Sequence, residues 1–534
     1  MRTPARLDIH LLLATIAVIF SLVGAFALFP VQTNEAAGHA FRFLTSTFGA
    51  PLQLIVFLSV LFLLFLALSK YGNIRLGTGE PEYSTFSWIS MMICCGISSA
   101  MLFWAFTDWA YDFGPRSRAP FMGAASPYEI GTAYTFFHWG FSTWGIYCIS
   151  ALPIAYYFFV RRHDGLSLSS VFEAAHSSLR GDGHGAGFQR VGLPATGFID
   201  LLFLVSCCTG ISIALGLSVP MLTELVASFF GFTPSFSLNM GVLFMISALF
   251  TLSSWLGIET GMRAMSRLGI WLIFLLVILI LLMGETRFML KSTVNSIGMV
   301  LQNFIRMSLW TDPAQDGGFP EKWTVWYWFY DISFTPFVGL FITRISRGRT
   351  LRALIFSMLI GGSAGAFTVF GVLSHHSVAC QLSGVVEVVG LVEQGRMNAA
   401  IVETLNALPA SSLLLIIFGA AAAMLLCTSL DSAAYTMAAT LTPGLPANRH
   451  PLPRHRFLCC LLLASVPVTT LLSEAPLETL KTFAILSGVP LAFVLGYVVY
   501  GFMRDMNADF SKYSPEDIRA LQGKSPVFFS SYDS

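Results

Sequence analysis

The sequence predicts an all-α integral membrane protein, and three observations carry that prediction. Of its 534 residues, 55% are hydrophobic and only 11% are charged, whereas soluble domains carry about 25% charged residues. Long apolar runs recur along the chain, as in 11–30 and 52–69, and about 20 helical residues cross the hydrocarbon core of a bilayer. No long linker separates these runs, so we expect one transmembrane domain over 1–503 and a short cytoplasmic tail over 504–534.

Apolar runs of about 18 residues or more are read as membrane spans, and the chain offers twelve candidates. They lie near 11–30, 52–69, 86–110, 131–160, 195–222, 239–257, 267–285, 322–345, 351–373, 410–440, 457–474 and 482–503.

The distribution of lysine and arginine predicts how these spans are oriented. With both termini in the cytoplasm, 21 of the 30 basic residues fall in inside segments and 9 in outside segments, Lys481 among the latter. Cytoplasmic loops of membrane proteins are enriched in lysine and arginine. The bias therefore supports twelve spans with both ends inside. Basic residues within 287–306 also predict an amphipathic helix on the outer surface.

The segment 322–345 carries a formal charge and a helix breaker, Asp331 and Pro336, among its aromatic residues. At about 100° per residue, Tyr330, Asp331 and Phe334 share one helical face with Tyr327. A carboxylate within the bilayer is costly and faces a protein interior or a pathway. We expect a cation site lined by aromatic rings in a helix broken at Pro336. The alternative is a carboxyl group satisfied by a neighbouring helix.

Two further segments contain similar features. The stretch 134–150 places Trp139, Trp144 and Tyr147 on a span interrupted by glycines, and 87–114 has a core of small residues followed by Tyr111. One such stripe alone is more often packing, but three of them favour a binding cavity.

The interrupted spans also suggest an internal repeat. The spans beginning near 86 and 322 are third and eighth in order, so each opens a five-helix unit, over about 86–285 and 322–503. An odd number of helices makes the two units topologically inverted, which is typical of secondary transporters with sites at the membrane midplane. The two helices over about 11–69 precede this five-plus-five repeat.

Four motifs resemble those of the betaine/carnitine/choline transporter family. They are KYGNIRLGTGEPEYSTFSW (70–88), FHWG (137–140), TDPAQDGGFPEKWTVWYW (311–328) and FITRISRGRT (341–350). The third is most similar to the carnitine/γ-butyrobetaine branch, and the resemblance runs from about residue 10 to 503. It implies a LeuT-like arrangement of twelve spans, a homotrimer and a central aromatic box for a quaternary amine.

The resemblance implies a specific set of substrate-binding positions. They are Tyr111, Trp139, Trp144, Tyr147, Trp328, Tyr330, Asp331 and Phe334. This chain reads YWFYDISF where the family usually has YWxWWxxW or YWxWWxxY, so an aspartate replaces an aromatic residue. A point charge there favours cations and repels a nearby substrate carboxylate, which gives choline-like amines weight against betaine and carnitine.

Coupling to an ion follows from the same resemblance. The stretch CTSLDSAAY (427–435) is similar to a sodium site of the sodium-coupled members, with Thr428 and Ser429 as the matching hydroxyls. Gly269 stands where the sodium-independent exchangers carry an arginine. The other sodium site of the family matches Cys207 and Ile211, which do not supply hydroxyls. Alternatively, Thr428 and Ser429 bond back to their own helix.

Other functions are less well supported. The metalloprotease motif HExxH and a GxSG serine within a span are absent, and the nine cysteines show no metal-ligand spacing. A net charge of +1 does not suggest nucleic acid. We therefore predict a secondary transporter of quaternary amines in the inner (plasma) membrane, surrounded by lipid and without a cofactor other than a coupling sodium ion. A sodium-independent exchanger is the alternative, and a channel or an intramembrane enzyme the remote one.

Overall fold

The structure is a computed structural model that describes most of the chain. The described residues are 7–96, 99–111, 120–122, 125–163, 167–180, 194–257, 261–313, 318–443, 445, 450–472 and 477–521. Within these ranges the regular structure is helical, and the β-type pairing is an isolated bridge between Arg75 and Thr350. The all-α prediction is confirmed for the described part of the chain.

Among the described residues, the first half of the chain contributes ten α-helices. They are α1 (Ile9–Leu28), α2 (Pro30–Leu68), α3 (Thr85–Gly96), α4 (Ser99–Thr107), α5 (Pro127–Trp139), α6 (Phe141–Ala155), α7 (Leu168–Arg180), α8 (Pro194–Phe230), α9 (Phe236–Leu256) and α10 (Arg263–Met283). Short 3-10 or π turns join them at η1 (Lys70–Asn73), η2 (Asp108–Ala110), η3 (Pro120–Met122) and η4 (Tyr156–Val160).

The second half contributes ten more. They are α11 (Thr286–Leu309), α12 (Trp326–Ile345), α13 (Leu351–Phe356), α14 (Ser363–Leu382), α15 (Val388–Glu393), α16 (Met397–Asn406), α17 (Ser411–Thr440), α18 (Pro453–Leu472), α19 (Leu477–Phe510) and α20 (Pro515–Ala520). The π turns η6 (Pro320–Val325) and η7 (Ser357–Gly362) precede α12 and α14.

Every predicted span coincides with a helix or with a run of adjoining helices. Eight of the described helices or runs are long and apolar enough to cross a membrane, and the bent pair α3 and α4 makes a ninth. The predicted spans 11–30, 322–345 and 457–474 correspond to α1, α12 and α18, which are not among these nine. The count of twelve therefore stays a prediction.

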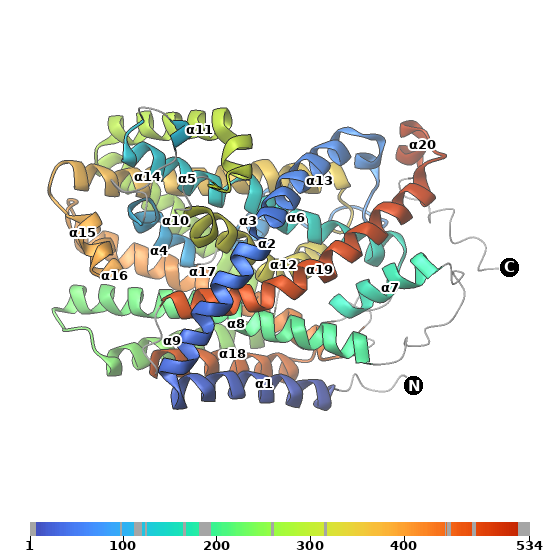
Figure 1. The fold of residues 1–534 in the computed structure, drawn as a ribbon, viewed down its shortest axis with the longest axis horizontal. Helices are drawn as coiled ribbons and strands as arrows, with labels where there is room; N and C mark the ends of the chain where they lie inside the picture. The colour runs from blue at the N-terminus through green and yellow to red at the C-terminus, as the bar shows by residue number, and fades with distance from the viewer. Residues whose placement is uncertain are drawn as a thin grey trace.

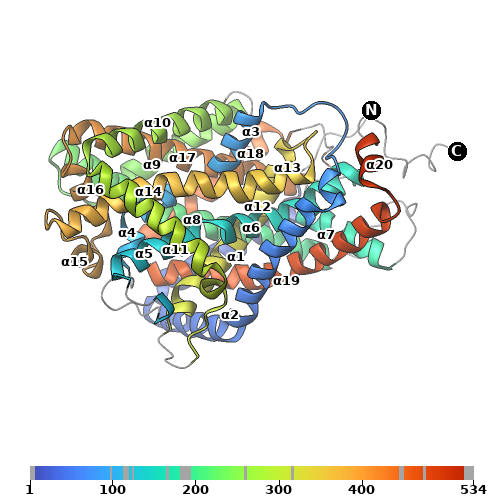
Figure 2. The same cartoon turned by 90° about the horizontal axis from the view of Figure 1, so that it is seen from above.

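At one end of the helical bundle, on the right-hand side of Figure 1, α1 begins and α19 ends. At this end the backbone N–H of Asp8 donates to the carbonyl of Leu441, 2.8 Å away, and so ties the start of α1 to the end of α17. Helix α11 crosses one face of the molecule, over α5 and α14 (Figure 2).

Two long spans are interrupted where the sequence predicted small residues to matter. Helices α3 and α4 meet at a bend of 68° between Gly96 and Ser99. A Cβ atom on Gly96 would lie 2.8 Å from the indole of Trp144, so glycine is needed for this approach. The second interruption is at Gly140, which separates α5 from α6.

The expected break at Pro336 is wrong, because α12 runs without interruption from Trp326 to Ile345. Proline removes one backbone hydrogen bond from a helix. Packing compensates here, since α12 is buried along nearly its whole length and makes its most extensive contacts with α6 and α19. The irregular segment lies instead just before α12, in the π turn η6.

The predicted tail boundary at residue 504 falls inside α19, which extends to Phe510. Asp505 and Asp509, on this last part of the helix, both pair with Arg161 at N···O distances of 2.9 Å. The polar segment is therefore held against the end of η4 before α20 begins.

Candidate functional site

Asp331 lies in the protein interior, with 3% of its surface exposed. The Thr143 hydroxyl donates to Oδ2 at 2.6 Å and the Tyr147 hydroxyl to Oδ1 at 3.1 Å. Both donors belong to α6, so the carboxyl group joins α6 to α12. Each carboxyl oxygen has one neutral donor, and no lysine or arginine in the described part of the chain forms an ion pair with it.

The aromatic stripe predicted on α12 is divided between two sides of the helix. Tyr327 stacks on His138 of α5, with ring centroids 4.6 Å apart. Tyr330 instead stacks on Trp326 at 5.5 Å and contacts Phe334 at 4.9 Å. A Cβ atom on Gly210 of α8 would lie 2.9 Å from the ring of Phe334. Tyr327 and Asp331 therefore meet α5 and α6, while Phe334 packs on α8.

The predicted tryptophans take three different environments. Trp144 contacts Tyr147 edge-on at 6.0 Å and is wedged between two glycines, Gly96 and Gly362, where Cβ atoms would collide with its indole. Trp139, at the end of α5, lies against Tyr327 and Phe370. Trp328 contacts Phe137 and His138. These residues surround the interface of α5, α6 and α12, but they do not form one closed box.

A second aromatic cluster lies at the start of α12, and the sequence analysis did not predict it as a unit. It consists of five residues, which we call the tryptophan cage: Trp104, Tyr111, Trp323, Trp326 and Tyr327. Of the predicted site residues only Tyr111 belongs to it, with its ring 5.1 Å from that of Trp323.

The ammonium group of Lys481 lies against this tryptophan cage. Its Nζ atom is 4.1 Å from the ring centroid of Trp323 and 4.6 Å from that of Trp326. Lys481 is fully buried near the start of α19, and its place on the outer side of the membrane stays a prediction. Asp108 is also buried and accepts a hydrogen bond from the Tyr327 hydroxyl at 2.7 Å.

The two predicted sodium ligands lie in the middle of α17 and are buried. The Thr428 hydroxyl donates to the carbonyl of Met424 at 2.8 Å, which leaves its lone pairs available. The Ser429 hydroxyl has no hydrogen-bond partner among the described residues. Gly269 of α10 packs on α17 one turn before Thr428, because a Cβ atom on Gly269 would lie 3.3 Å from Cβ of Met424.

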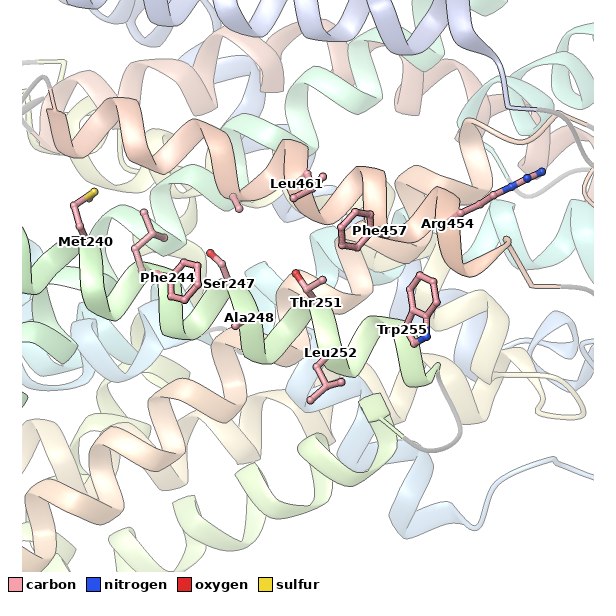
Figure 3. A pocket seen from close by; sticks show the side chains of 12 residues that line it. Met240, Phe244, Ser247, Ala248, Thr251, Leu252, Trp255, Arg454, Phe457 and Leu461 are labelled. Carbon is pink, nitrogen blue, oxygen red and sulfur yellow. The ribbon is translucent and has the colours of Figure 1, made fainter.

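Away from these residues, α9 and α18 enclose an apolar groove with a volume of about 1170 Å³. Phe244, Leu252 and Phe457 line it, and Trp255 and Arg454 lie toward one end (Figure 3). All nine cysteines are buried and unpaired. In the part of the chain described here, no three His, Cys, Asp or Glu side chains gather as a metal site would require.

Membrane-length helices with buried charged side chains and an interrupted span are the features expected of a membrane transporter. The family model of the betaine/carnitine/choline family transporters matches residues 10–511, and the chain belongs to this family. The protein is therefore a multi-pass membrane transporter of quaternary-ammonium or related amine solutes, not an enzyme.

Relatives extend over nearly the whole chain. A carnitine transporter of Acinetobacter baumannii is 35% identical over 510 residues, 96% of this chain and 91% of its own. The uncharacterized transporter YeaV of Escherichia coli K12 is 35% identical over 480 residues, 89% of this chain and 96% of its own. A solved structure of a Na⁺-coupled sialic acid symporter in a substrate-bound, outward-open state aligns with a TM-score of 0.47 and 15% identity, over 89% of this chain and 96% of its own.

Proposed function

We propose that this transporter recognises the ammonium group of its solute at the interface of α6 and α12. The single observation that carries the proposal is the buried Asp331 carboxyl group, held by Thr143 and Tyr147. A buried carboxylate with only neutral donors pays a desolvation cost that a cation in direct contact would offset. Aromatic faces nearby add attraction for a quaternary ammonium group of roughly 0.5–2 kcal/mol each.

The eight predicted residues have different roles in this proposal. Asp331 supplies the charge, while Tyr147 and Thr143 orient it. The aromatic surroundings are formed by Trp139, Trp144, Trp328, Tyr330 and Phe334. Tyr111 belongs to the tryptophan cage, at the start of α12. A solute carboxylate is tolerated only where it points away from Asp331. Because one relative is named a carnitine transporter, carnitine and betaine belong to the candidate solutes together with choline.

For coupling, we propose a single sodium ion at Thr428 and Ser429. Sodium prefers oxygen ligands, and the Ser429 hydroxyl is buried with no partner among the described residues. Gly269, which packs against Met424 of α17, supplies no guanidinium group where the sodium-independent exchangers carry an arginine. The alternative is a sodium-independent exchanger, such as a carnitine/γ-butyrobetaine antiporter.

We also propose the wider setting of the protein. Both termini lie in the cytoplasm, the chain spans the inner membrane, and three copies assemble as the family resemblance implies. The groove between α9 and α18 accommodates a lipid chain, because its lining is almost entirely apolar and Arg454 is available for a phosphate.

The test is transport by the purified full chain in proteoliposomes. Uptake of radiolabelled choline, betaine and carnitine is measured with external sodium or potassium and with or without unlabelled solute inside. Saturable uptake against a gradient in sodium supports symport. Uptake that needs internal solute and ignores sodium supports exchange. If none of the three solutes is taken up or exchanged, the proposed substrate class is wrong.

A further inference from the structure

The most unusual group outside the Asp331 site is the buried amine of Lys481. Its side chain is 0% exposed and reaches from α19 to the start of α12. A lysine ammonium is compact and strongly hydrated, so full burial requires compensation. The structure supplies two kinds of compensation, aromatic faces and a carboxylate.

The aromatic faces form a cage of the kind that binds ammonium ions. Trp323 and Trp326 are nearly perpendicular, at 84°, with ring centroids 6.2 Å apart, and Nζ of Lys481 is within 5 Å of both centroids. A cation within about 6 Å of a ring centroid is attracted by the ring. Trp104 closes a further side, with centroids 6.3 Å from Trp323 and 5.9 Å from Trp326.

The carboxylate is Asp108 on η2, at the end of the interrupted α3–α4 span. It is 0% exposed and accepts a hydrogen bond from the hydroxyl of Tyr327, whose ring belongs to the tryptophan cage. Asp108, the tryptophan cage and Lys481 thus bring together segments distant in sequence, namely α4 with η2, η6 with the start of α12, and the start of α19. Parting of these helices would separate the amine from the rings and from Asp108.

We propose that Lys481 is a tethered cation that fills the tryptophan cage, so that an ammonium solute binds there only when the lysine side chain has left. The lysine competes as part of the same molecule, and groups linked by short flexible tethers act at effective concentrations on the order of millimolar. The inference deepens the proposed function, since it adds a second position that selects among amines along α12.

The test compares binding of tetramethylammonium to wild type and to Lys481→Met, using calorimetry on the full chain in detergent. Methionine keeps much of the length of the side chain but removes the charge. We expect at least tenfold tighter binding to one site, and we expect Trp323→Leu in the same background to abolish the gain. Lys291→Met, which changes an exposed lysine on α11, should bind as wild type does.

The same comparison in an Asp331→Asn background separates this proposal from the previous one. Asp331 contacts α6, whereas Lys481 contacts Trp323 and Trp326, so the gain from Lys481→Met should persist even if Asp331 has no role in binding. Equal affinity of wild type and a folded Lys481→Met protein overturns the tethered-cation proposal alone.

A measurement on the wild-type protein keeps the proposal testable if Lys481→Met does not fold. Saturating tetramethylammonium should expel Lys481 and increase its acylation by N-hydroxysuccinimidyl acetate several-fold, as measured by peptide mass spectrometry. Lys291 serves as the internal control and should react at an unchanged rate. No increase at Lys481 would overturn the proposal.

Discussion

Two carboxylate sites, one at Asp505 and Asp509 of α19 and one at Asp331 of α12, accept hydrogen bonds from tyrosines of one span but differ in their counter-charge. In η4, Tyr156 and Tyr157 donate to Asp509 and Asp505 at 2.5 and 2.7 Å, and Arg161 pairs with both carboxylates. Midway along α6, Tyr147 donates to Asp331 in the same manner. There a second hydroxyl, that of Thr143, takes the place of the arginine.

The difference has a physical consequence. The Asp505–Asp509 site contains a counter-charge from the folded chain itself, the guanidinium of Arg161. Asp331 has hydroxyl donors alone, and these compensate only part of the cost of burying a carboxylate. We therefore expect changes at the arginine site to alter stability, and changes at Asp331 to alter ligand binding.

The largest effect is expected for Asp331→Asn. Removing one member of a buried charge pair costs about 2–5 kcal/mol, so binding of choline should weaken tens-fold or more. Betaine and carnitine should lose less, because their carboxylates no longer meet a like charge. Dissociation constants from tryptophan fluorescence test this, and unchanged values for all three ligands in a folded protein would leave Asp331 a purely structural link between helices.

Asp331→Trp tests the same charge from the opposite direction. It places an aromatic residue where the family usually has one and should shift preference from choline toward betaine and carnitine. A shift in the other direction would contradict the role given to the carboxylate.

Arg161→Gln should have the next largest effect, and on stability instead of binding. Arg161 is 14% exposed and Asp505 is 3% exposed, so the variant leaves nearly buried carboxylates without a counter-charge, which costs roughly 2–4 kcal/mol. The thermal unfolding midpoint should fall by several degrees while dissociation constants stay within twofold of wild type. A loss of affinity without a loss of stability would reverse the comparison.

These contrasts show which features of the fold and of the site could be predicted from the sequence alone. The helical segments were predictable because about 20 apolar residues leave few alternatives in a membrane. Of the two glycines expected to interrupt the span 134–150, Gly140 lies between two helices, whereas Gly145 lies within the continuous α6. The burial of Lys481 was not predictable, since a lysine beside an apolar run resembles a loop residue. Its cage needs Trp323 and Trp326 from a segment about 155 residues earlier, and such proximity is set by packing.

Side-chain direction was the second limit. Periodicity placed Tyr330 and Asp331 on one face of α12, yet Asp331 meets α6 and Tyr330 stacks on Trp326. Residues next to each other in a helix point about 100° apart, so which neighbour each one contacts depends on how the helices surround α12. The Thr143 donor had no signal of its own, because threonine is common in such spans.

A pair of tyrosine variants, one at each carboxylate site, should have smaller effects that distinguish ligand binding from stability. Tyr147→Phe removes one of the two donors to Asp331 and should weaken choline binding about five- to tenfold, since a hydrogen bond to a charged group is worth about 1.5–3 kcal/mol at most. Tyr157→Phe removes a comparable donor from Asp505 but leaves Arg161 in place. It should lower the unfolding midpoint slightly and leave binding unchanged, so equal binding losses in both variants would remove the distinction.

The smallest expected effect concerns sodium, and it tests whether the buried Ser429 hydroxyl, like the Asp331 carboxylate, binds a ligand from outside the chain. The Ser429 hydroxyl has no partner among the described residues, and the Thr428 hydroxyl bonds back to its own helix. If the two oxygens bind sodium, the double variant Thr428→Ala/Ser429→Ala should lower uptake several-fold at low sodium and flatten its sodium dependence. Thr223→Ala is the matched control, because Thr223 is buried and bonded back to Val219 in the same way on α8, and its sodium response should equal that of wild type. Wild-type uptake that is identical in sodium and potassium would remove the sodium site, and the unpartnered serine would then count as a packing residue in a substrate exchanger.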